Sequence, residues 1–223
     1  NYVKHSDKAE EVVNQIRALG GEAIAIKADV ASRDDARRLV ETTVDNFGRL
    51  DILVNNAGIL IRGGIFDDVS ILDRLMDVNV KGVIYCSSIA AKIMMKQRSG
   101  RIINVSSIAG MGTSARNTTY YAISKAAVII LTKRLALELG EYGITVNAVA
   151  PGLIITDMFE SQSIEERENM LKLAIEKSML RRVGSPDDVA SLITYLASDE
   201  AGFITGQIIT IDGGRIDFLS RSH

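Results

Sequence analysis

Short apolar segments alternate with amphipathic helical segments along most of this chain, and this alternation limits the fold more than any other feature. Parallel strands need a crossover connection, which is usually a helix packed on the sheet. The order therefore predicts an α/β fold, with a doubly wound parallel sheet between helices in three α/β/α layers. The expected strands are residues 23–28, 51–54, 101–105, 144–149 and 207–211. With 223 residues, 1–223 is expected to form one domain.

Three expected helices begin at recognisable cap residues. Ser6 or Asp7 is expected to cap the first helix, and Ser32 the second. Ser185 precedes a proline and two acidic residues, a pattern typical of a helix start. The other helices are expected near residues 70–96, 119–141 and 163–178.

Tyr121 and Lys125 are four residues apart in an apolar helical segment. This spacing places both side chains on one helix face, about 6 Å apart along the axis. A nearby ammonium lowers the pKa of a phenol from its usual value of about 10. Ser107 follows a strand, where its hydroxyl is able to polarise a carbonyl oxygen. The three residues suit proton transfer in carbonyl reduction or alcohol oxidation, although the tyrosine–lysine spacing alone is a weak signal.

The composition excludes several other classes of protein. The net charge is −2 and the pI about 5.8, so no nucleic-acid partner is expected. The single cysteine, Cys86, indicates a reducing, cytoplasmic environment. The apolar runs are too short to span a bilayer, so no membrane association is expected. No metal site is predicted.

The residues that suit ligand binding follow the expected strands. They are Asp29, Asn55 to Gly58, Ser107 and Pro151-Gly152. In open parallel sheets, ligands bind beyond the carboxyl ends of the strands. Small residues there allow a flat ligand to approach the backbone, so the placement favours a nucleotide cofactor.

At this level of detail the sequence resembles the short-chain dehydrogenase/reductase family, and the resemblance covers essentially the whole chain. The matching motifs stand in family order at family spacing: Asn55-Asn56-Ala57-Gly58, Asn79, Asn104-Val105-Ser106-Ser107, Tyr121 with Lys125, Pro151-Gly152 with Thr156-Asp157-Met158, and Asp212-Gly213-Gly214. The resemblance implies a Rossmann-like fold.

The resemblance also implies roles for individual residues. Tyr121 is the expected general acid/base, and Lys125 would lower its pKa and bind the nicotinamide ribose. Ser107, rather than Ser106, corresponds to the serine that polarises the carbonyl. Asn79 would hold a water that links Lys125 to solvent. Tyr120 has no lysine four residues later and is not expected to be catalytic.

The implied cofactor is NADP, with NAD as the alternative. No acidic residue stands at the place that would repel a 2′-phosphate, which corresponds to Asn1, and Lys4, His5 and Ser6 offer contacts for that phosphate. A solvated loop explains those three residues equally well. The implied cofactor-binding residues are Asp29, Val30, Asn56, Ala57, Gly58, Tyr121, Lys125, Pro151, Gly152, Ile154 and Thr156.

The family's first strand and glycine-rich pyrophosphate loop have no counterpart in this sequence. In the family's strand order, two strands lie between the strand at 23–28 and the strand at 51–54. We therefore expect these two segments not to pair with each other. If they stand about three strand spacings apart, the pyrophosphate site must come from residues outside this sequence, or be absent.

Three hypotheses for function remain open. The first is an NADP-linked oxidoreductase acting on a carbonyl or secondary alcohol, with 3-oxoacyl thioester reduction as a candidate reaction. The second is an NAD-linked sugar or polyol dehydrogenase. The third, from a different class, is a catalytically silent nucleotide-binding or assembly protein.

Two further features concern substrate access and assembly. Residues 156–182 form a candidate substrate lid, although a packing helix is an equal reading. The helices around residues 82–96 and 119–141 are apolar on several sides, which suggests a homo-oligomer, a dimer or tetramer. Asn55, by contrast, is expected to join neighbouring strands rather than to bind a ligand.

Overall fold

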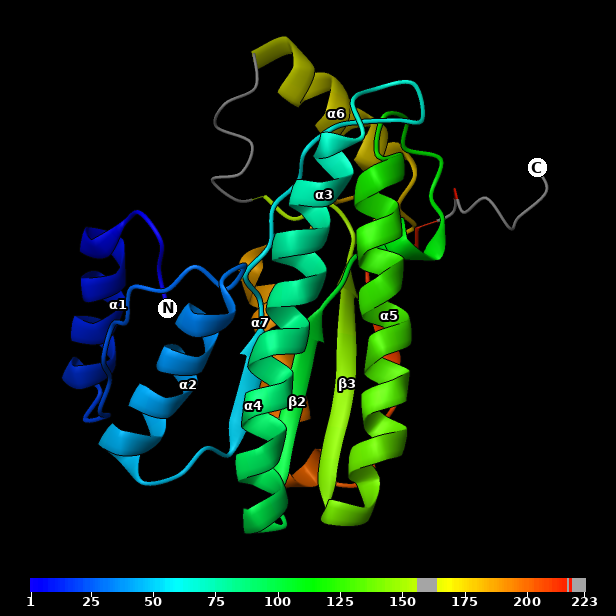
Figure 1. Ribbon diagram of the computed structural model, residues 1–223. Coiled ribbons are helices and arrows are strands. Elements are labelled where there is room, and N and C mark those ends of the chain that lie inside the picture. The colour runs from blue at the N-terminus through cyan, green and yellow to red at the C-terminus, as the bar shows by residue number, and fades with distance from the viewer. Residues whose placement is uncertain (156–163, 216, 218–223) are drawn as a thin grey trace.

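The computed structural model describes residues 1–155, 164–215 and 217. Four parallel strands form one sheet in the order β1-β2-β3-β4 (Figure 1). The strands are β1 (Ile52–Asn55), β2 (Gly100–Val105), β3 (Ile144–Pro151) and β4 (Ile208–Ile211). Each strand returns to the same end of the sheet through a helical crossover, so the predicted doubly wound parallel α/β fold is confirmed.

Helices cover both faces of this sheet. On one face, α4 (Gly82–Gln97) and α5 (Thr119–Leu139) bury a core that includes Met94, Ile102 and Val146. On the other face, α7 (Pro186–Ala197) packs Leu196 against Ile103 and Val149. Strand β3 is buried along almost its whole length, as a central strand covered on both faces should be. The three layers are therefore α/β/α, as predicted.

The N-terminal part contains α1 (Ser6–Ala18) and α2 (Arg33–Phe47), which lie beside the sheet in Figure 1. The predicted strand at 23–28 is wrong in extent, because only Lys27 forms a bridge, with Tyr2. Two backbone hydrogen bonds, Tyr2 to Ile26 and Ala28 to Tyr2, make this contact, and a single facing residue is too short for a ladder. Among the described strands, β1 pairs only with β2, so 23–28 and β1 do not pair, as expected.

Two of the three predicted helix caps are confirmed. Ser32 and Ser185 each accept a hydrogen bond from the third backbone N–H of their helix. At α7, Asp188 completes a capping box by accepting from the backbone N–H of Ser185. The predicted cap at Ser6 or Asp7 is wrong, because α1 already begins at Ser6 and His5 is its N-cap, without a side-chain cap among the described contacts.

A π-helical turn interrupts the long helix that precedes β2. It covers Asp77–Lys81 and joins α3 (Ser70–Met76) to α4. Asn79 lies in the middle of this turn and is almost fully buried. Such turns widen the helix locally and occur often at functional sites. The turn aims the Asn79 side chain away from α4 and toward α5, as the contacts below show.

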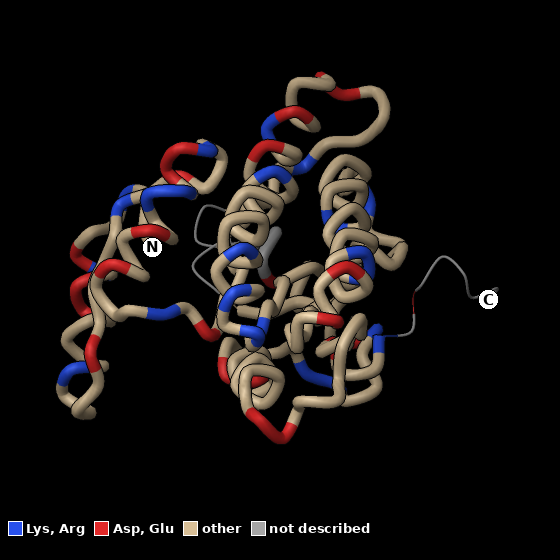
Figure 2. The backbone as a smooth tube through the Cα atoms, turned by 60° about the horizontal axis from the view of Figure 1, so that its bottom comes forward, with Lys and Arg blue, Asp and Glu red and all other residues tan. Residues whose placement is uncertain are grey.

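Charged residues are distributed unevenly among the helices. In Figure 2 acidic and basic residues both mark α1 and α2, whereas α4 carries only basic ones. The described part of the chain contains no cluster of three or more metal-ligating residues. None of its described helices is both long and apolar enough to cross a bilayer.

Candidate active site

Helix α5 brings Tyr121 and Lys125 together at its N-terminal end. The Lys125 side chain is only 5% exposed, which is unusual for a lysine. Its Nζ lies 5.8 Å from the centre of the Tyr121 ring. The spacing of four residues therefore produces the shared face that the sequence predicts.

The residues that follow β2 complete the site. Ser107 is the extended N-cap of a short 3₁₀ turn, Ile108–Met111, and its hydroxyl accepts a hydrogen bond from the N–H of Ala109. The Ser107 hydroxyl also bonds to the phenol of Tyr121. A Cβ at Gly110 would lie 2.6 Å from the carbonyl carbon of Lys125. Glycine at this position therefore lets the turn press directly against α5 beside the lysine.

The end of β2 also fixes the position of Lys125. Its Nζ donates to the carbonyl oxygen of Val105 at 2.9 Å. The buried hydroxyl of Ser106 donates to the carbonyl oxygen of Lys125, also at 2.9 Å. Ser106 therefore holds the lysine backbone, while Ser107 faces the phenol. This division supports the choice of Ser107 over Ser106 as the residue that faces the substrate.

The pKa shift of Tyr121 differs from the one expected beside Lys125. Burial raises the pKa of the Tyr121 phenol above its usual value, and the hydrogen bond with Ser107 offsets part of that rise. Burial also lowers the pKa of Lys125 to about 8. The predicted lowering of the Tyr121 pKa by Lys125 is therefore wrong for this arrangement. The cause is that the ammonium bonds to the Val105 carbonyl and lies beside the ring, away from a direct hydrogen bond to the phenol oxygen.

The Asn79 side chain contacts both the segment after β1 and helix α5. Its Oδ1 accepts from the N–H of Ile59 at 2.8 Å, and its Nδ2 donates to the carbonyl oxygen of Ile59 at 2.9 Å. The second Nδ2 hydrogen reaches Ser124 Oγ on α5 at 3.1 Å. The side chain thus ties the segment after β1 to α5.

Gly58, after β1, lets the chain pass close to Lys125. Asn56 and Ala57, just before it, are exposed. A Cβ at Gly58 would lie 3.3 Å from Asn79 Oδ1 and 3.4 Å from Lys125 Nζ. Glycine therefore lets the backbone lie against both polar groups, where a side chain would crowd them.

Two groups of predicted cofactor residues remain. They are Asp29 and Val30 in the N-terminal part, and Pro151, Gly152, Ile154 and Thr156 at and after the end of β3. Asp29 is half-buried and its Oδ1 accepts from the N–H of Ala31, whereas Val30 packs into the core against Gly82. Gly152 approaches the backbone of Asp212 so closely that a Cβ would lie 2.9 Å from its Cα. Pro151 ends β3 and Ile154 bridges to Gly184. Thr156 lies outside the described residues.

Comparison with known proteins gives a consistent relationship. A family model described as enoyl-(acyl carrier protein) reductase matches residues 2–215. A 3-oxoacyl-[acyl-carrier-protein] reductase of Synechocystis sp. is 45% identical over 224 residues, which is 98% of this chain and 86% of that protein. This chain belongs to the short-chain dehydrogenase/reductase family. It is therefore an oxidoreductase of the NAD(P)-dependent kind.

Solved structures of this family agree with the fold. A 7α-hydroxysteroid dehydrogenase complexed with NADH and 7-oxo glycochenodeoxycholic acid superposes with a TM-score of 0.87 at 34% identity, covering 96% of this chain and 82% of that one. ElxO with NADP bound gives a TM-score of 0.84 at 31% identity, covering 95% of this chain and 84% of that one. The first structure is a complex with NADH and the second holds NADP, so these two relatives bind different nicotinamide cofactors.

Asn55 and Tyr120, which were not predicted to be catalytic, make structural contacts. Asn55 donates to Asn104 Oδ1 at 2.8 Å and to Ser87 Oγ at 3.0 Å, and so joins β1, β2 and α4. Its predicted structural role is confirmed. Tyr120 is buried, and its hydroxyl donates to the carbonyl oxygen of Asp67 at 3.3 Å. Tyr120 is therefore directed away from Tyr121 and anchors the loop before α3.

Sequence reasoning missed the contacts of Ser106 and Ser124, which both donate to backbone carbonyls of α5. Ser124 donates to the carbonyl oxygen of Tyr121 at 2.7 Å. Ser124 stands three residues after Tyr121 and one before Lys125, so its spacing was the available signal. The sequence gives no comparable sign that Ser106 points inward while Ser107 points toward the phenol.

Proposed function

We propose that this protein transfers a hydride between NADP(H) and a carbonyl or secondary alcohol, and that a 3-oxoacyl thioester is its preferred substrate class. The observation that carries the proposal is the buried group formed by Ser107, Tyr121 and Lys125. A phenol bonded to a serine hydroxyl beside a buried ammonium has few structural purposes, and it suits proton transfer to a carbonyl oxygen. The name of the 45%-identical relative supports the substrate class.

In this proposal each residue acts at a stated atom. The Tyr121 phenol gives its proton to the carbonyl oxygen in reduction and takes it back in oxidation. The Ser107 hydroxyl donates to the same oxygen and stabilises the negative charge that develops there. Lys125 places a positive charge beside the phenol ring, and Asn79 fixes the local backbone. When bound, the dinucleotide supplies or accepts the hydride.

The residues present fit two parts of a dinucleotide, the ribose next to the nicotinamide and the 2′-phosphate. The Lys125 ammonium suits contact with a ribose hydroxyl, and Gly58 lets the backbone lie close to it. At the N-terminus of α1, Lys4, His5 and Ser6 are exposed and offer positive charge and hydrogen bonds to a 2′-phosphate. Lys4, His5 and Ser6 are the reason for proposing NADP over NAD.

Two other functions would give different results in the same assays. An NAD-linked sugar or polyol dehydrogenase would prefer NADH and reject 3-oxoacyl thioesters. A catalytically silent scaffold would bind a dinucleotide and turn nothing over. The intact Ser107, Tyr121 and Lys125 group argues against the silent scaffold.

The first test measures dinucleotide absorbance with both cofactors against 3-oxoacyl thioesters, diketones and sugars. Tyr121→Phe keeps the ring and removes the exchangeable proton, so turnover should fall at least about a hundredfold. Tyr120→Phe is the matched control, because that hydroxyl bonds only to the carbonyl of Asp67 among its described contacts. Equal losses in the two variants, or no loss in either, would refute the assignment.

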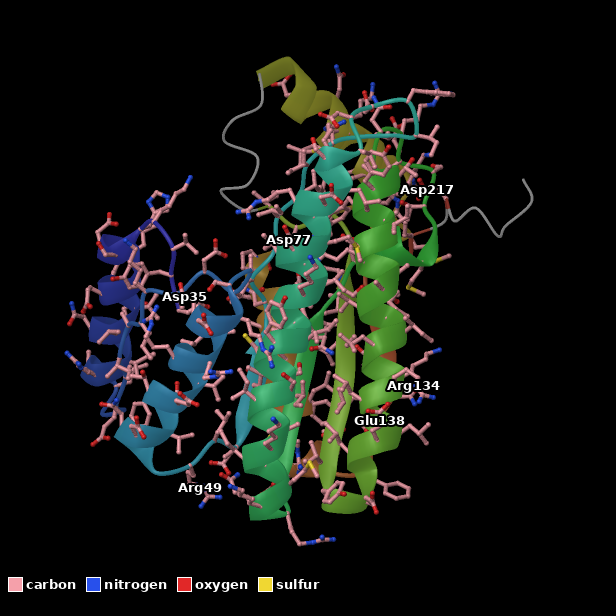
Figure 3. All side chains as sticks on the ribbon, viewed as in Figure 1. Asp35, Arg49, Asp77, Arg134, Glu138 and Asp217 are labelled. Atoms are coloured by element: carbon pink, nitrogen blue, oxygen red, sulfur yellow. The ribbon has the colours of Figure 1, made fainter. Side chains whose placement is uncertain are left out.

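Three further features belong to the same proposal. We propose a homo-oligomer, a dimer or tetramer, because α5 exposes Ile123, Ile130 and Leu137 at 45%, 58% and 71%. Figure 3 shows Arg134 and Glu138 together on this helix, and they form an ion pair at 3.4 Å.

Residues 156–182, which include α6 (Ile164–Glu176), are proposed as the substrate lid. A cytoplasmic location is proposed from the single cysteine.

A further inference from the structure

The hydroxyl of Ser124 lies where three segments of the proposed active site meet. Ser124 is fully buried on α5, one residue before Lys125. Its Oγ donates to the carbonyl oxygen of Tyr121 at 2.7 Å and accepts from Asn79 Nδ2 at 3.1 Å. Both hydrogen-bonding roles of the hydroxyl are therefore filled by residues of the site.

The contact with Asn79 distinguishes this serine from an ordinary helical serine. Serine hydroxyls commonly bond to a carbonyl in the preceding turn of their own helix, and that bond alone would carry little meaning. Here the same oxygen also accepts from an amide on a different helix. That amide is held at its other atoms by the backbone of Ile59. A continuous chain of hydrogen bonds therefore runs from Ile59 through Asn79 and Ser124 to Tyr121.

The other end of the Asn79 amide lies close to Lys125. The Asn79 Oδ1 and the Lys125 Nζ lie 3.3 and 3.4 Å from one point, the place that a Cβ on Gly58 would occupy. A movement of the Asn79 amide would therefore change the surroundings of the ammonium. The same movement would release the first turn of α5, which carries the phenol.

We infer that Ser124 is a positioning residue, whose hydroxyl fixes the first turn of α5 against Asn79 and so sets the Tyr121 phenol relative to the Lys125 ammonium. This inference rests on the proposed function. Ser124 does not touch the reacting atoms itself. Loss of its hydroxyl should therefore affect turnover and its pH dependence more than substrate binding.

The same helix contains a matched control. Thr132 is also fully buried, donates to the carbonyl oxygen of Val128 at 2.8 Å, and accepts from Asn104 Nδ2 at 2.9 Å. Its chemistry thus repeats that of Ser124 two turns further along α5. It bonds to Val128 and Asn104 instead of Tyr121 and Asn79. Removing either hydroxyl leaves a buried asparagine N–H without its partner, so similar losses of stability are expected.

The experiment compares Ser124→Ala, Ser124→Thr and Thr132→Val with the unchanged protein. Initial rates are measured with NADPH and acetoacetyl-coenzyme A, and stability is measured by urea unfolding. Ser124→Ala should lower kcat about tenfold and change KM less than about twofold. In the reverse direction, measured with NADP⁺ and 3-hydroxybutyryl-coenzyme A, the pH at which alcohol oxidation rises should move upward by about half a unit. Thr132→Val should lose comparable stability and keep kcat within about twofold.

Ser124→Thr supplies the rescue. Its hydroxyl is able to bond to the preceding turn, as threonine does in helices, so kcat should return to within about threefold of the unchanged protein. If Ser124→Ala does not fold, Ser124→Cys replaces it, since a thiol is only slightly larger than a hydroxyl and forms weaker hydrogen bonds. The same selective loss of kcat is expected for that variant.

Three outcomes would overturn the inference. They are equal loss of kcat in Ser124→Ala and Thr132→Val, an unchanged kcat and pH profile in the Ser124 variant, and a loss confined to KM. A fourth outcome concerns the proposed function instead. If Tyr121→Phe keeps full turnover, the assignment of the phenol fails, and the inference about Ser124 fails with it.

Discussion

Replacing the buried Lys125 with methionine should change the pH dependence of stability by a calculable amount. Burial lowers the pKa of this lysine from 10.5 to about 8. Below pH 8 the folded protein must therefore keep a charge in a place that disfavours it. The free-energy cost is about 3 kcal/mol at pH 7, since each unit of pKa corresponds to about 1.4 kcal/mol.

The sign follows from proton binding in the two states. Between pH 8 and pH 10.5 the unfolded lysine is protonated and the folded one is not, so raising the pH stabilises the folded protein. From about pH 7 to about pH 9.5 the cost falls from about 3 to about 1 kcal/mol. Lys125→Met removes this dependence. Relative to the variant, the unchanged protein should therefore gain about 2 kcal/mol over that interval.

The pH difference is the quantity to measure, because a second effect acts at every pH. Methionine cannot donate to the Val105 carbonyl, and an unpaired buried carbonyl costs about 1–3 kcal/mol. This cost does not titrate, so it shifts both ends of the comparison equally. Urea unfolding at the two pH values gives the result directly. Lys133→Met, at an exposed position on the same helix, is the control and should show no such difference.

A change of less than about 0.5 kcal/mol between the two pH values would refute the reasoning. It would mean that Lys125 titrates near its ordinary pKa and that the site admits more water than its burial implies. A variant that is destabilised less at high pH than at low pH would contradict the sign of the argument.

Four other outcomes are expected. Gly110→Ala should unfold at clearly lower urea concentration, because its Cβ would meet the Lys125 backbone at 2.6 Å, whereas Gly140→Ala, with open space around it, should not. Ser185→Ala should cost about 1 kcal/mol in urea unfolding and Ser6→Ala close to nothing, because only the first serine caps its helix. Because burial raises the pKa of Tyr121, carbonyl reduction should stay nearly constant from about pH 6 to about pH 8 while alcohol oxidation rises, and stopped-flow rates that fall for reduction over that interval would contradict this. Light scattering at micromolar concentration should show a tetramer, and a monomer would remove the role proposed for the exposed side chains of α5.

The sequence predicted most of the sheet because periodicity and chain order carry that information. The strands at 101–105 and 144–149 are mostly apolar, and such runs are typical of strands buried on both faces of a sheet. The segment 23–28 is also apolar, yet it forms a single bridge. A strand exists only when another strand faces it, and composition contains no information about the partner.

The site shows the same distinction. The Tyr121 and Lys125 pair and the turn at Ser107 follow from helix spacing and strand ends, and they were predictable. The direction of the Tyr121 pKa was not, because it depends on where the ammonium points and how deeply the ring is buried. The tie from Asn79 to Ser124 likewise depends on the π-helical turn, which has no signature in the residue types.

The π-helical turn at Asp77–Lys81 has a consequence for chain length. One residue added to or removed from a helix rotates everything beyond it by about 100°. Directly beyond this turn, α4 carries Ser87, which bonds to Asn55 at the carboxyl end of β1. A single-residue deletion at the turn would break either that bond or the bonds of Asn79 to Ile59, since one rigid helix cannot satisfy both after the rotation. The number of residues at this place is therefore under as strict a physical constraint as the identity of any catalytic side chain.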